Sequence, residues 1–586
     1  MQKQLFFFLI CAFTGGLTAP TFSQAHITPI LEQAFQQGKN MDILVIFKEK
    51  ADLSAATRIH GKNQKAAFVF AQLQSVAERT QRPVRDFLHL ENAEVNSFYI
   101  VNAISVKNCS ATLARQLASF ETVATIASDP WVSLPLPVQE PIVAERDGVE
   151  WGIEKINAPS VWALGYSGQG VTVGGADTGY DFTHPALNSH YRGFNTISGQ
   201  TDHNYSWHDA IIAPSPLNTT PDNPCGYNID APCDDHGHGT HTAGTMAGDD
   251  HQGNQIGVAP GAKWIGCRNM ERGSGQPSSY IECFEWFLAP TDLNGENPNI
   301  DFAPHVINNS WYCSSEEGCT DTSVDELIHE ALVNLKASGV VVVVSNGNFG
   351  NGGCATTTGA PAYFAESFSV GSTTSDDLIS NFSSKGPVFV DLSGRIKPDV
   401  SAPGQAVRSC IPGNNYAFFS GTSMAGPHVA GLVALILSAN PALAGEVAAI
   451  ENIIKNTCVP LNGPVDCSDN NGMNYPNNTF GYGRINALDA VNDALSISNT
   501  SFIADVPQCY AYPNPVHNEL IVQSNGNAQI TACQITDVQG RQVRAWPGHE
   551  SSQLRLDLTG FTEGVYLIYA TLSTGNIQTL KVVVQH

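Results

Sequence analysis

Between Trp151 and Leu495, apolar strand-like runs alternate with helical segments, and this alternation constrains the fold more than any other feature of the chain. The runs "VTVGGA" and "GVVVVVS" are continuously apolar, and stretches such as "SVDELIHEALVNLKASG" have helical periodicity. Strands that are apolar on both faces need cover on both faces, so the pattern predicts an α/β unit with a doubly wound parallel sheet. Because sites in such sheets lie at the carboxyl ends of the strands, we expect the functional residues there.

Two smaller units flank this α/β unit. From Asp42 the pattern runs β-α-β-β-α-β up to about Val123, which predicts a ferredoxin-like α+β module. The proline-rich and charged stretch "LPLPVQEPIVAERDGVE" follows as an exposed linker. From Cys509 onward, apolar and polar residues alternate between Gly and Asn turns, as in a small all-β sandwich.

The first residues are typical of a secretory signal peptide. Lys3 precedes a short apolar run over residues 5–13, and small residues follow it. The run is too short to span a membrane, and we expect no later segment of spanning length. The predicted divisions are residues 1–24 (signal peptide), 25–145 (N-terminal module and linker), 146–497 (α/β unit), 498–508 (linker) and 509–586 (β-sandwich).

Charge and cysteine usage agree with export. The chain has 54 acidic against 29 basic residues, a net charge of −25, which argues against nucleic-acid binding and against a polybasic membrane patch. In an oxidising compartment, closely spaced cysteines predict local disulfides, with zinc binding as the alternative, although the chain has no C-x-x-C motif. The predicted pairs are Cys225–Cys233, Cys267–Cys283, Cys313–Cys319 and Cys458–Cys467.

Three segments carry residues suited to nucleophilic catalysis. "VTVGGADTGYDFTHP" ends an apolar strand on Asp177, and "DDHGHGTHTAGT" contains His236, His238 and His241. "SGTSMAGPHVAGLVALIL" places Ser423 where a turn enters an apolar helix, so helix N–H groups can stabilise an oxyanion. A serine nucleophile needs a base and an acidic group that orients the base. Asp177, one of these histidines and Ser423 can supply all three.

These segments resemble motifs of the subtilisin-like serine peptidases, whose triad follows the order Asp, His, Ser. The matching residues are "DTG" at Asp177, "HGTHTAGT" from His238 and "GTSMAGPH" from Gly421. "WGIEKINAPSVWALGYSGQGV" and "AKWIGCRN" look closest to the bacillopeptidase F-like branch. The resemblance implies a secreted serine endopeptidase with the triad Asp177, His238 and Ser423.

The resemblance also assigns the histidines. The base is the first histidine of H-G-T-H, which is His238, while His241 is structural and His236 has no counterpart in the motif. A zinc site would instead need a glutamate between two histidines on one helical face, as in H-E-x-x-H. The segment has glycine and threonine there, so metal chemistry is disfavoured.

Two further segments take roles from the resemblance. "VVVVVSNGNFG" supplies Asn348 as the oxyanion donor, and "NNSWYC" normally lines the substrate channel. The residues expected to bind substrate are Ser310, Trp311, Tyr312, Ser345, Asn346 and Gly347. Tyr312 stands where the family usually has glycine, which alters the pocket. The pocket for the substrate residue before the cut bond would lie between residues 344–347 and Tyr312. Neither side offers a clear carboxylate for a basic side chain, so we expect an apolar or aromatic residue at this position of the substrate.

The flanking units resemble accessory parts of exported peptidases. The N-terminal module resembles a subtilisin propeptide, an intramolecular inhibitor that is cut away, here between about residues 134 and 150. "YPNP" from Tyr512, "GVYLIYA" and Lys581 resemble the C-terminal sorting domain of the type IX secretion system. An accessory sandwich that binds a surface or polysaccharide is the alternative.

These resemblances define the expected partners and location. The partners are protein or peptide substrates, the chain's own propeptide and the outer-membrane secretion machinery, and the location is extracellular or at the outer-membrane surface after passage through the periplasm. The chemistry needs no cofactor. Structural calcium is common in the family, but no D-x-D-x-D-G loop locates a site. The alternative function is a surface-displayed binding or adhesion protein that retains a peptidase fold.

Overall fold

The computed structural model describes residues 25–585 with several gaps. The gaps are residues 135–137, 140–147, 221, 315–317, 463–466, 468–474, 498–508, 525–528, 538–540 and 574–576. The predicted signal peptide, most of the first linker and all of the second linker therefore lie outside the described residues.

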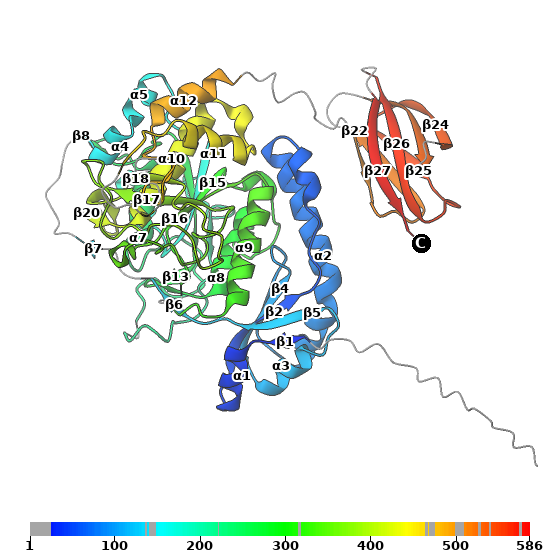
Figure 1. The fold of residues 1–586 in the computed structure, drawn as a ribbon, viewed down its shortest axis with the longest axis horizontal. Helices are drawn as coiled ribbons and strands as arrows, with labels where there is room; N and C mark the ends of the chain where they lie inside the picture. The colour runs from blue at the N-terminus through cyan, green and yellow to red at the C-terminus, as the bar shows by residue number, and fades with distance from the viewer. Residues whose placement is uncertain are drawn as a thin grey trace, which may run out of the picture.

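The central unit contains a seven-stranded parallel sheet (Figure 1). The strand order is β10-β12-β9-β15-β16-β17-β18, and the registers of all six neighbouring pairs are parallel. The strands are β9 (Thr172–Asp177), β10 (Trp207–Asp209), β12 (Lys263–Arg268), β15 (Val306–Asn309), β16 (Val341–Ser345), β17 (Phe368–Thr373) and β18 (Val400–Pro403). The parallel sheet predicted from the apolar runs is confirmed.

Helices cover both faces of this sheet. On β16, Val341 and Val343 pack into one apolar cluster with α7, α10, α11 and α12, whereas Val342 and Val344 pack into another with α8 and α9. Successive strand residues point to opposite faces, which explains this division. The helices are α7 (His238–Ala247), α8 (Pro277–Leu288), α9 (Thr322–Ala337), α10 (Thr422–Ala439), α11 (Val447–Asn456) and α12 (Ala487–Ser496).

The helix α10 corrects one expectation. Its 18 residues have a mean hydropathy of 1.4, so it is long and apolar enough to cross a membrane, contrary to the prediction that no later segment is. Of its residues, 89% are buried in the α/β unit, where the helix packs against the sheet and α7. It is therefore a core helix, and burial on all sides explains its continuous apolar sequence.

The N-terminal unit has the predicted β-α-β-β-α-β order from β2 to β5, preceded by a short strand and helix. Its sheet order is β1-β5-β2-β4-β3, and Figure 1 shows α8 and α9 between this unit and the parallel sheet. The elements are β1 (His26–Ile27), α1 (Pro29–Gln36), β2 (Met41–Phe47), α2 (Lys62–Leu90), β3 (Val95–Phe98), β4 (Ala103–Cys109), α3 (Ala111–Leu117) and β5 (Val123–Ser128).

The C-terminal unit consists of two antiparallel sheets around one apolar core. Alternate residues of β26 are buried, which is the period expected of a strand with one face on a core. One sheet contains β21 (Cys509–Tyr512), β22 (Glu519–Ser524) and β25 (Gln553–Asp557). The other contains β23 (Ile530–Asp537), β24 (Gln542–Ser551), β26 (Gly564–Leu572) and β27 (Ile577–Val584).

Three of the four predicted disulfides are confirmed and one is wrong. The confirmed pairs are Cys225–Cys233, Cys267–Cys283 and Cys313–Cys319. Cys467 is instead bonded to Cys354, 113 positions away, and Cys458 is a buried free thiol whose Sγ donates to the carbonyl of Ile454. Proximity in sequence failed here because the fold brings a distant loop to Cys467.

Candidate active site

The predicted site residues converge at the carboxyl edge of three neighbouring strands. Asp177 is the last residue of β9, Ser310 directly follows β15, and Asn348 lies three residues after β16. Ser423, the second residue of α10, meets the same edge, because its carbonyl accepts a 2.9 Å hydrogen bond from Ser310 Oγ. The candidate residues therefore lie at the carboxyl ends of parallel strands, where such sheets are expected to hold their sites.

His238 is oriented by Asp177. The imidazole begins helix α7, is 1% exposed, and its Nδ1 lies 2.7 Å from Asp177 Oδ1. Two further groups hold that carboxylate: the backbone N–H of Thr178 donates to Oδ1 at 2.8 Å and Thr242 Oγ1 donates to Oδ2 at 3.3 Å. The carboxylate therefore fixes both the position and the tautomer of the ring.

The electrostatics of His238 suit a general base. Burial by itself lowers the pKa of His238, but the charge of Asp177, its hydrogen bond and the charge of Asp234 outweigh burial and raise the pKa above 6.5. The Nε2 atom is buried and has no hydrogen-bond partner among the described residues. It is thus the ring atom left to exchange a proton.

The other two histidines of the segment have different surroundings. His241 Nε2 lies 3.0 Å from the carbonyl of Val407, and the ring stacks on Phe419 at 4.4 Å. Burial lowers the pKa of His241 to about 3, so the ring is neutral and structural. His236 lies beside Gly273, with its ring 6.3 Å from that of His238. Within the described ranges, no group of three His, Cys, Asp or Glu side chains is arranged to hold a metal.

Hydrogen bonds link Asn348 to Thr422, the residue that precedes Ser423. Ser423 is 3% exposed, and its Oγ donates to the carbonyl of Ser310 at 3.2 Å. Asn348 Oδ1 accepts from the N–H and the hydroxyl of Thr422 at 2.9 and 3.0 Å. This fixes the amide with Nδ2 toward the turn before Ser423, 3.7 Å from where a Cβ on Gly421 would stand.

The residues predicted to bind substrate after β16 are held by the turn itself. Asn346 is buried, and its Nδ2 donates to Thr357 Oγ1 at 2.9 Å and to the carbonyl of Ser384 at 2.7 Å. Gly347 has a φ of +103°, which favours glycine, and Ser345 is buried at the strand end. The side chain of Asn346 is thus structural.

Two residues after β15 that were predicted to bind substrate, Trp311 and Tyr312, have buried side chains. The Trp311 indole is fully buried and stacks on Tyr280 of α8 at 4.1 Å, so its side chain belongs to the core and only its backbone can face a substrate. Tyr312 is 2% exposed and packs edge-to-face on Phe349 at 5.4 Å. The bulk that replaces the usual glycine therefore fills space next to the turn that carries Asn348.

Comparison with known proteins decides the family. The model of the subtilase family matches residues 168–483, a span that includes Asp177, His238, Asn348 and Ser423. The chain belongs to the subtilase family. This subtilase is a serine endopeptidase, and it contains a secretion system C-terminal sorting domain over residues 510–585. The sorting domain indicates type IX secretion to the extracellular space or cell surface.

Individual relatives agree with this assignment. Bacillopeptidase F of Bacillus subtilis is 34% identical over 500 residues, which are 80% of this subtilase but only 32% of that protein. This subtilase thus spans about a third of the length of bacillopeptidase F. Subtilisin E of Bacillus subtilis is 32% identical over 55% of the chain and 69% of its own length. Subtilisin of Bacillus pumilus is 33% identical over 50% of the chain and 86% of its own length.

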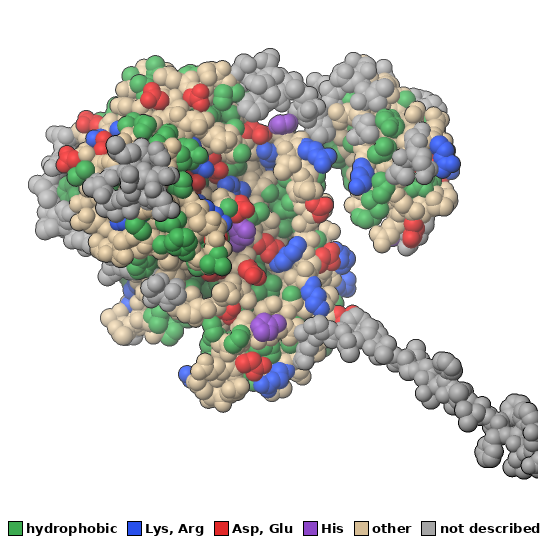
Figure 2. All heavy atoms as spheres, in the orientation of Figure 1, with side chains coloured by type: hydrophobic (Ala, Val, Ile, Leu, Met, Phe, Trp, Pro, Cys, Tyr) green, Lys and Arg blue, Asp and Glu red, His purple; other side chains and the backbone are tan. Residues whose placement is uncertain are grey.

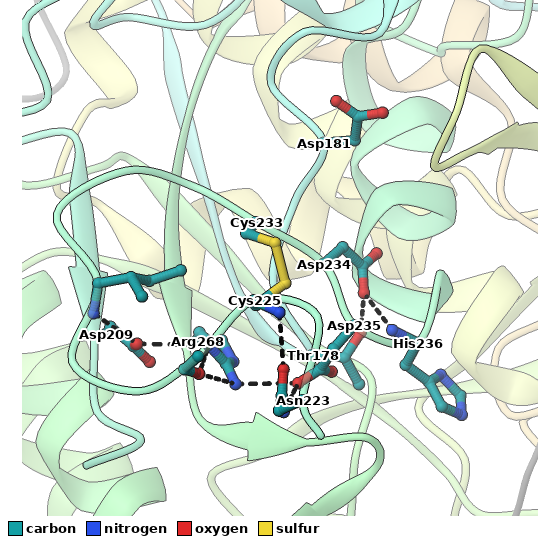
Figure 3. Close-up of a disulfide and its surroundings, with 12 residues drawn as sticks. Thr178, Asp181, Asp209, Asn223, Cys225, Cys233, Asp234, Asp235, His236 and Arg268 are labelled. Atoms are coloured by element: carbon teal, nitrogen blue, oxygen red, sulfur yellow. Dashed lines mark hydrogen bonds and ion pairs between the residues drawn. A yellow bond between two sulfur atoms is a disulfide. The ribbon is translucent and has the colours of Figure 1, made fainter.

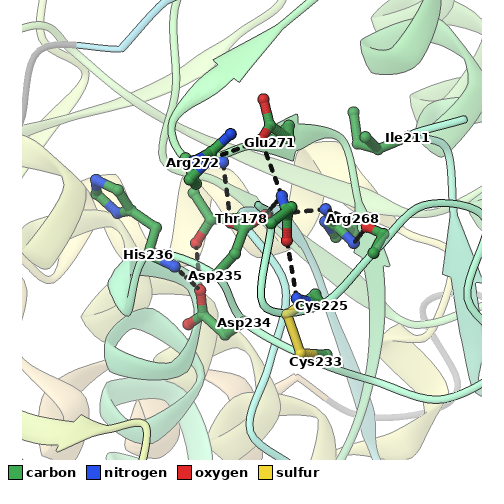
Figure 4. A network of polar contacts seen from close by, with 12 residues as sticks. Thr178, Ile211, Cys225, Cys233, Asp234, Asp235, His236, Arg268, Glu271 and Arg272 are labelled. Atoms are coloured by element: carbon green, nitrogen blue, oxygen red, sulfur yellow. Dashed lines mark hydrogen bonds and ion pairs between the residues drawn. A yellow bond between two sulfur atoms is a disulfide. The ribbon is translucent and has the colours of Figure 1, made fainter. Parts of the chain in front are cut away.

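Asp234 is a residue beside the site of the subtilase that sequence reasoning did not single out. Its Oδ1 accepts from the backbone N–H of His236 at 3.0 Å (Figure 4). Oδ1 also accepts from the N–H of Gly237 at 2.8 Å, and Oδ2 accepts from that of Thr240 at 2.9 Å. Thr178 Oγ1 also donates to Oδ1 at 2.9 Å. Asp234 therefore joins the turn after Asp177 to the start of α7. The signal for it is an acidic residue just before a helix N-terminus.

A buried ion-pair network holds the loop that carries Asp234. Arg268 is fully buried on β12, directly opposite Asp177 in the ladder, and its Nη2 lies 2.9 Å from Asp235 Oδ2 (Figure 3). The same guanidinium donates to the carbonyl of Gly226 at 3.1 Å, inside the loop closed by Cys225–Cys233. The disulfide and Arg268 together fix the residue that precedes His236.

Two short strands between the N-terminal unit and the start of the α/β unit pair with strands of the α/β unit. β6 (Val132–Ser133) pairs antiparallel with β14 (Ser274–Gly275), and the N–H of Leu134 donates to the carbonyl of Gly273 at 2.7 Å. β7 (Val138–Gln139) pairs antiparallel with β20 (Asn415–Ser420), which ends three residues before Ser423. Strand addition of this kind is a common way for enzymes and binding domains to hold extended peptides.

Proposed function

We propose that this subtilase hydrolyses peptide bonds of proteins through an acyl-enzyme on Ser423. The observation that carries the proposal is the buried 2.7 Å contact between Asp177 and His238 at the sheet edge that Ser423, in the first turn of α10, also meets. A buried carboxylate–imidazole pair next to a serine at a helix N-terminus is the arrangement that activates a serine nucleophile.

The chain's own groups suggest each step. Ser423 Oγ leaves the carbonyl of Ser310, gives its proton to His238 Nε2 and attacks the substrate carbonyl. Asp177 holds the Nδ1–H and stabilises the imidazolium. The oxyanion is bound by Asn348 Nδ2 and the backbone N–H of Ser423 at the positive end of α10. His238 then protonates the leaving amine, and water releases the acyl group by the reverse proton path.

The N-terminal unit acts in this proposal as a ferredoxin-like propeptide that blocks the site. The pairings of β6 with β14 and of β7 with β20 support it, because they hold the segment that follows the N-terminal unit against the α/β unit, and β20 ends three residues before Ser423. The side chains of Val132 and Leu134 are buried in the cluster that contains Trp311, which supports the acceptance of apolar residues. The proposed cut between about residues 134 and 150 lies mostly outside the described residues.

Buried polar contacts between the two units support a specific, pre-formed complex. Asp129 of the N-terminal unit accepts from the N–H of Ser278 at 2.9 Å, in the first turn of α8. Asp321, at the N-terminus of α9, accepts from the N–H of Ser128 at 3.1 Å. Both carboxylates lie where helix N-termini favour negative charge, so release of the unit would expose these two helix ends.

The C-terminal unit would be read by the outer-membrane secretion machinery as a β-sandwich sorting domain. The alternative of an adhesion protein that keeps a peptidase fold is disfavoured. Asp177, His238, Asn348 and Ser423 are all present, and a non-catalytic descendant has no physical need for all four.

Incubation of the purified mature protein with casein, with and without a serine-reactive phosphonate, tests the function. We expect casein cleavage that the phosphonate abolishes, with the label on Ser423 in a peptide map. A Ser423→Ala variant is the matched control and should neither cleave nor take the label. Cleavage that survives the phosphonate and the substitution would refute the mechanism.

A further inference from the structure

The N-terminal unit contacts the α/β unit at two opposite edges of the parallel sheet. At the carboxyl edge, β6 pairs with β14, which follows the carboxyl end of β12, and β7 pairs with β20, which ends three residues before Ser423. At the other edge, the first turn of α2 lies against Ala303 and Gly339, which lead into β15 and β16. Because the amino and carboxyl ends of a strand are at opposite edges of its sheet, this second contact is separate from the substrate cleft.

Two buried lysines make the polar part of this contact. Lys62 Nζ donates to the carbonyl of Ala303 at 2.7 Å, and Lys65 Nζ donates to the carbonyl of Gly445 at 2.6 Å. Lys65 Nζ also lies 3.2 Å from Glu446 Oε2. The two lysines are only 6% and 9% exposed, and buried ammonium groups are tolerated only where acceptors meet them. We call these five residues the amino-edge anchor.

The backbones at the anchor approach closely because glycines stand there. Gly339 and Gly445 have φ angles of +93° and +90°. A Cβ on Gly445 would stand 2.7 Å from the backbone N of Lys62, and one on Gly339 would stand 2.9 Å from the Cα of Gly445. The surface is thus shaped to the first turn of α2 as well as matched to its charge.

The length of α2 explains how one helix reaches both units. Its 29 residues span about 43 Å at 1.5 Å per residue. Val69 and Leu73 in its first half pack in the same cluster as Leu335 of α9, while Val84 and Leu88 near its end pack in the core of the N-terminal unit. Figure 1 shows α2 running alongside α9, and Figure 2 shows basic and acidic side chains interspersed over this face.

We propose that the amino-edge anchor is a second docking surface for the chain's own N-terminal unit and that it keeps this unit bound after the linker has been cut. The inference rests on the proposed function, in which that unit is a cleaved inhibitor. Once the linker is cut, the strands at the cleft can dissociate, whereas Lys62 and Lys65 stay buried on the opposite edge. Because the N-terminal unit is still held at the anchor, its strands rebind to the cleft as in an intramolecular reaction. The unit is released only when the contacts at both edges are open at the same time.

Retention of the cleaved unit by the full-length protein tests the proposal. The double variant Lys62→Met and Lys65→Met keeps the apolar stems but removes both charges, and Lys39→Met with Lys48→Met is the control, since Lys39 and Lys48 are exposed in the same unit. Gel filtration measures whether the cleaved N-terminal unit co-elutes with the α/β unit. A casein assay measures the lag before proteolytic activity appears. The anchor variant should release the unit at least about tenfold faster, with a proportionally shorter lag.

The possible results separate the two proposals. If the lag of the anchor variant equals the lags of the wild type and the control, the proposed role of the anchor is wrong, but the inhibitor role of the N-terminal unit is not affected. A wild type that shows neither co-elution nor a lag would instead overturn the inhibitor role of the N-terminal unit.

A second variant guards against misfolding of the first. Glu446→Gln alters only the α/β side of the anchor, and Glu154→Gln at an exposed position is its control. We expect release about threefold faster for Glu446→Gln alone. If the lysine variant stays uncut and Glu446→Gln releases the unit at the control rate, the proposal is wrong.

Discussion

His238 Nδ1 lies 2.7 Å from Asp177 Oδ1, and the two residues are 61 positions apart in the chain. Each stands at the end of its own element, Asp177 closing β9 and His238 opening α7. Because the folded pKa of His238 is raised, the stabilisation from this pair is complete below pH 6.5 and is lost as the pH rises through the folded pKa. The same pair sets the chemistry of the site.

His238→Ala should abolish proteolysis and leave the precursor uncut, because no other ring is positioned by Asp177. The expected loss in kcat is about 10⁴-fold or more. His236→Ala is the control and should remain largely active, since its ring makes no hydrogen bond to that carboxylate. Equal inactivation by both substitutions, with recovery on adding zinc, would show that the segment binds metal.

The pH dependence of kcat/KM should have an acidic limb centred above 6.5. The base must be neutral to accept a proton, and the charge of Asp177 keeps His238 protonated to higher pH than a free histidine. Asp177→Asn removes that charge, so its residual activity should show the limb at lower pH. Initial rates on a short peptide across pH 5 to 9 measure the shift, and an unmoved limb would exclude His238 as the titrating group.

Asp234→Ala should lower kcat/KM through loss of positioning, although Asp234 does not touch the reacting atoms. The substitution removes the acceptor for three N–H groups at the start of α7, and small displacements of a catalytic base cost up to about 100-fold. Asp222→Asn, at an exposed position in the preceding loop, is the control. A purely structural role would lower the melting temperature but leave kcat of the folded fraction unchanged.

Cys467→Ser should destabilise the α/β unit by about 2–5 kcal/mol, because the bond to Cys354 closes a long loop. Cys458→Ser should change stability by about 1 kcal/mol or less, since a hydroxyl can also donate to the carbonyl of Ile454. Both are measured by denaturant unfolding in a Ser423→Ala background, which prevents self-digestion. Peptide mapping that finds Cys458 bonded to Cys467 would contradict the assignment.

Truncation after residue 507 should leave an active enzyme in the periplasm. The C-terminal unit has its own core and the site is complete without it, so catalysis should survive while export fails. Fractionation of cells that express the full and truncated chains, followed by a casein assay of periplasm and medium, measures this. Normal release of the truncated enzyme into the medium would refute a sorting role.

Features that depend on local pattern were predictable from the sequence. The run from Val340 to Val344 is apolar at every position and too short for a buried helix, which favours a strand covered on both faces, and it forms most of the inner strand β16. The motif segments around Asp177, His238 and Ser423 were recognisable because they resemble those of the subtilisin-like serine peptidases. Three short disulfides, among them Cys225–Cys233, followed from spacing, since a short loop brings its two cysteines close, although the same reasoning failed for Cys458 and Cys467.

Only the tertiary structure decided which distant segments meet. Cys467 pairs with Cys354 because two loops 113 positions apart come together, and Trp311 turns into the core because Tyr280 of α8 lies beneath it. The docking of Lys62 and Lys65 on the amino edge was likewise invisible, since lysines in a helical pattern predict a solvated face. The sequence by itself determined the elements and the chemistry they carry, because local periodicity and motifs reflect short-range physics. Contacts between elements depend on the relative placement of whole segments, which no short stretch of sequence encodes.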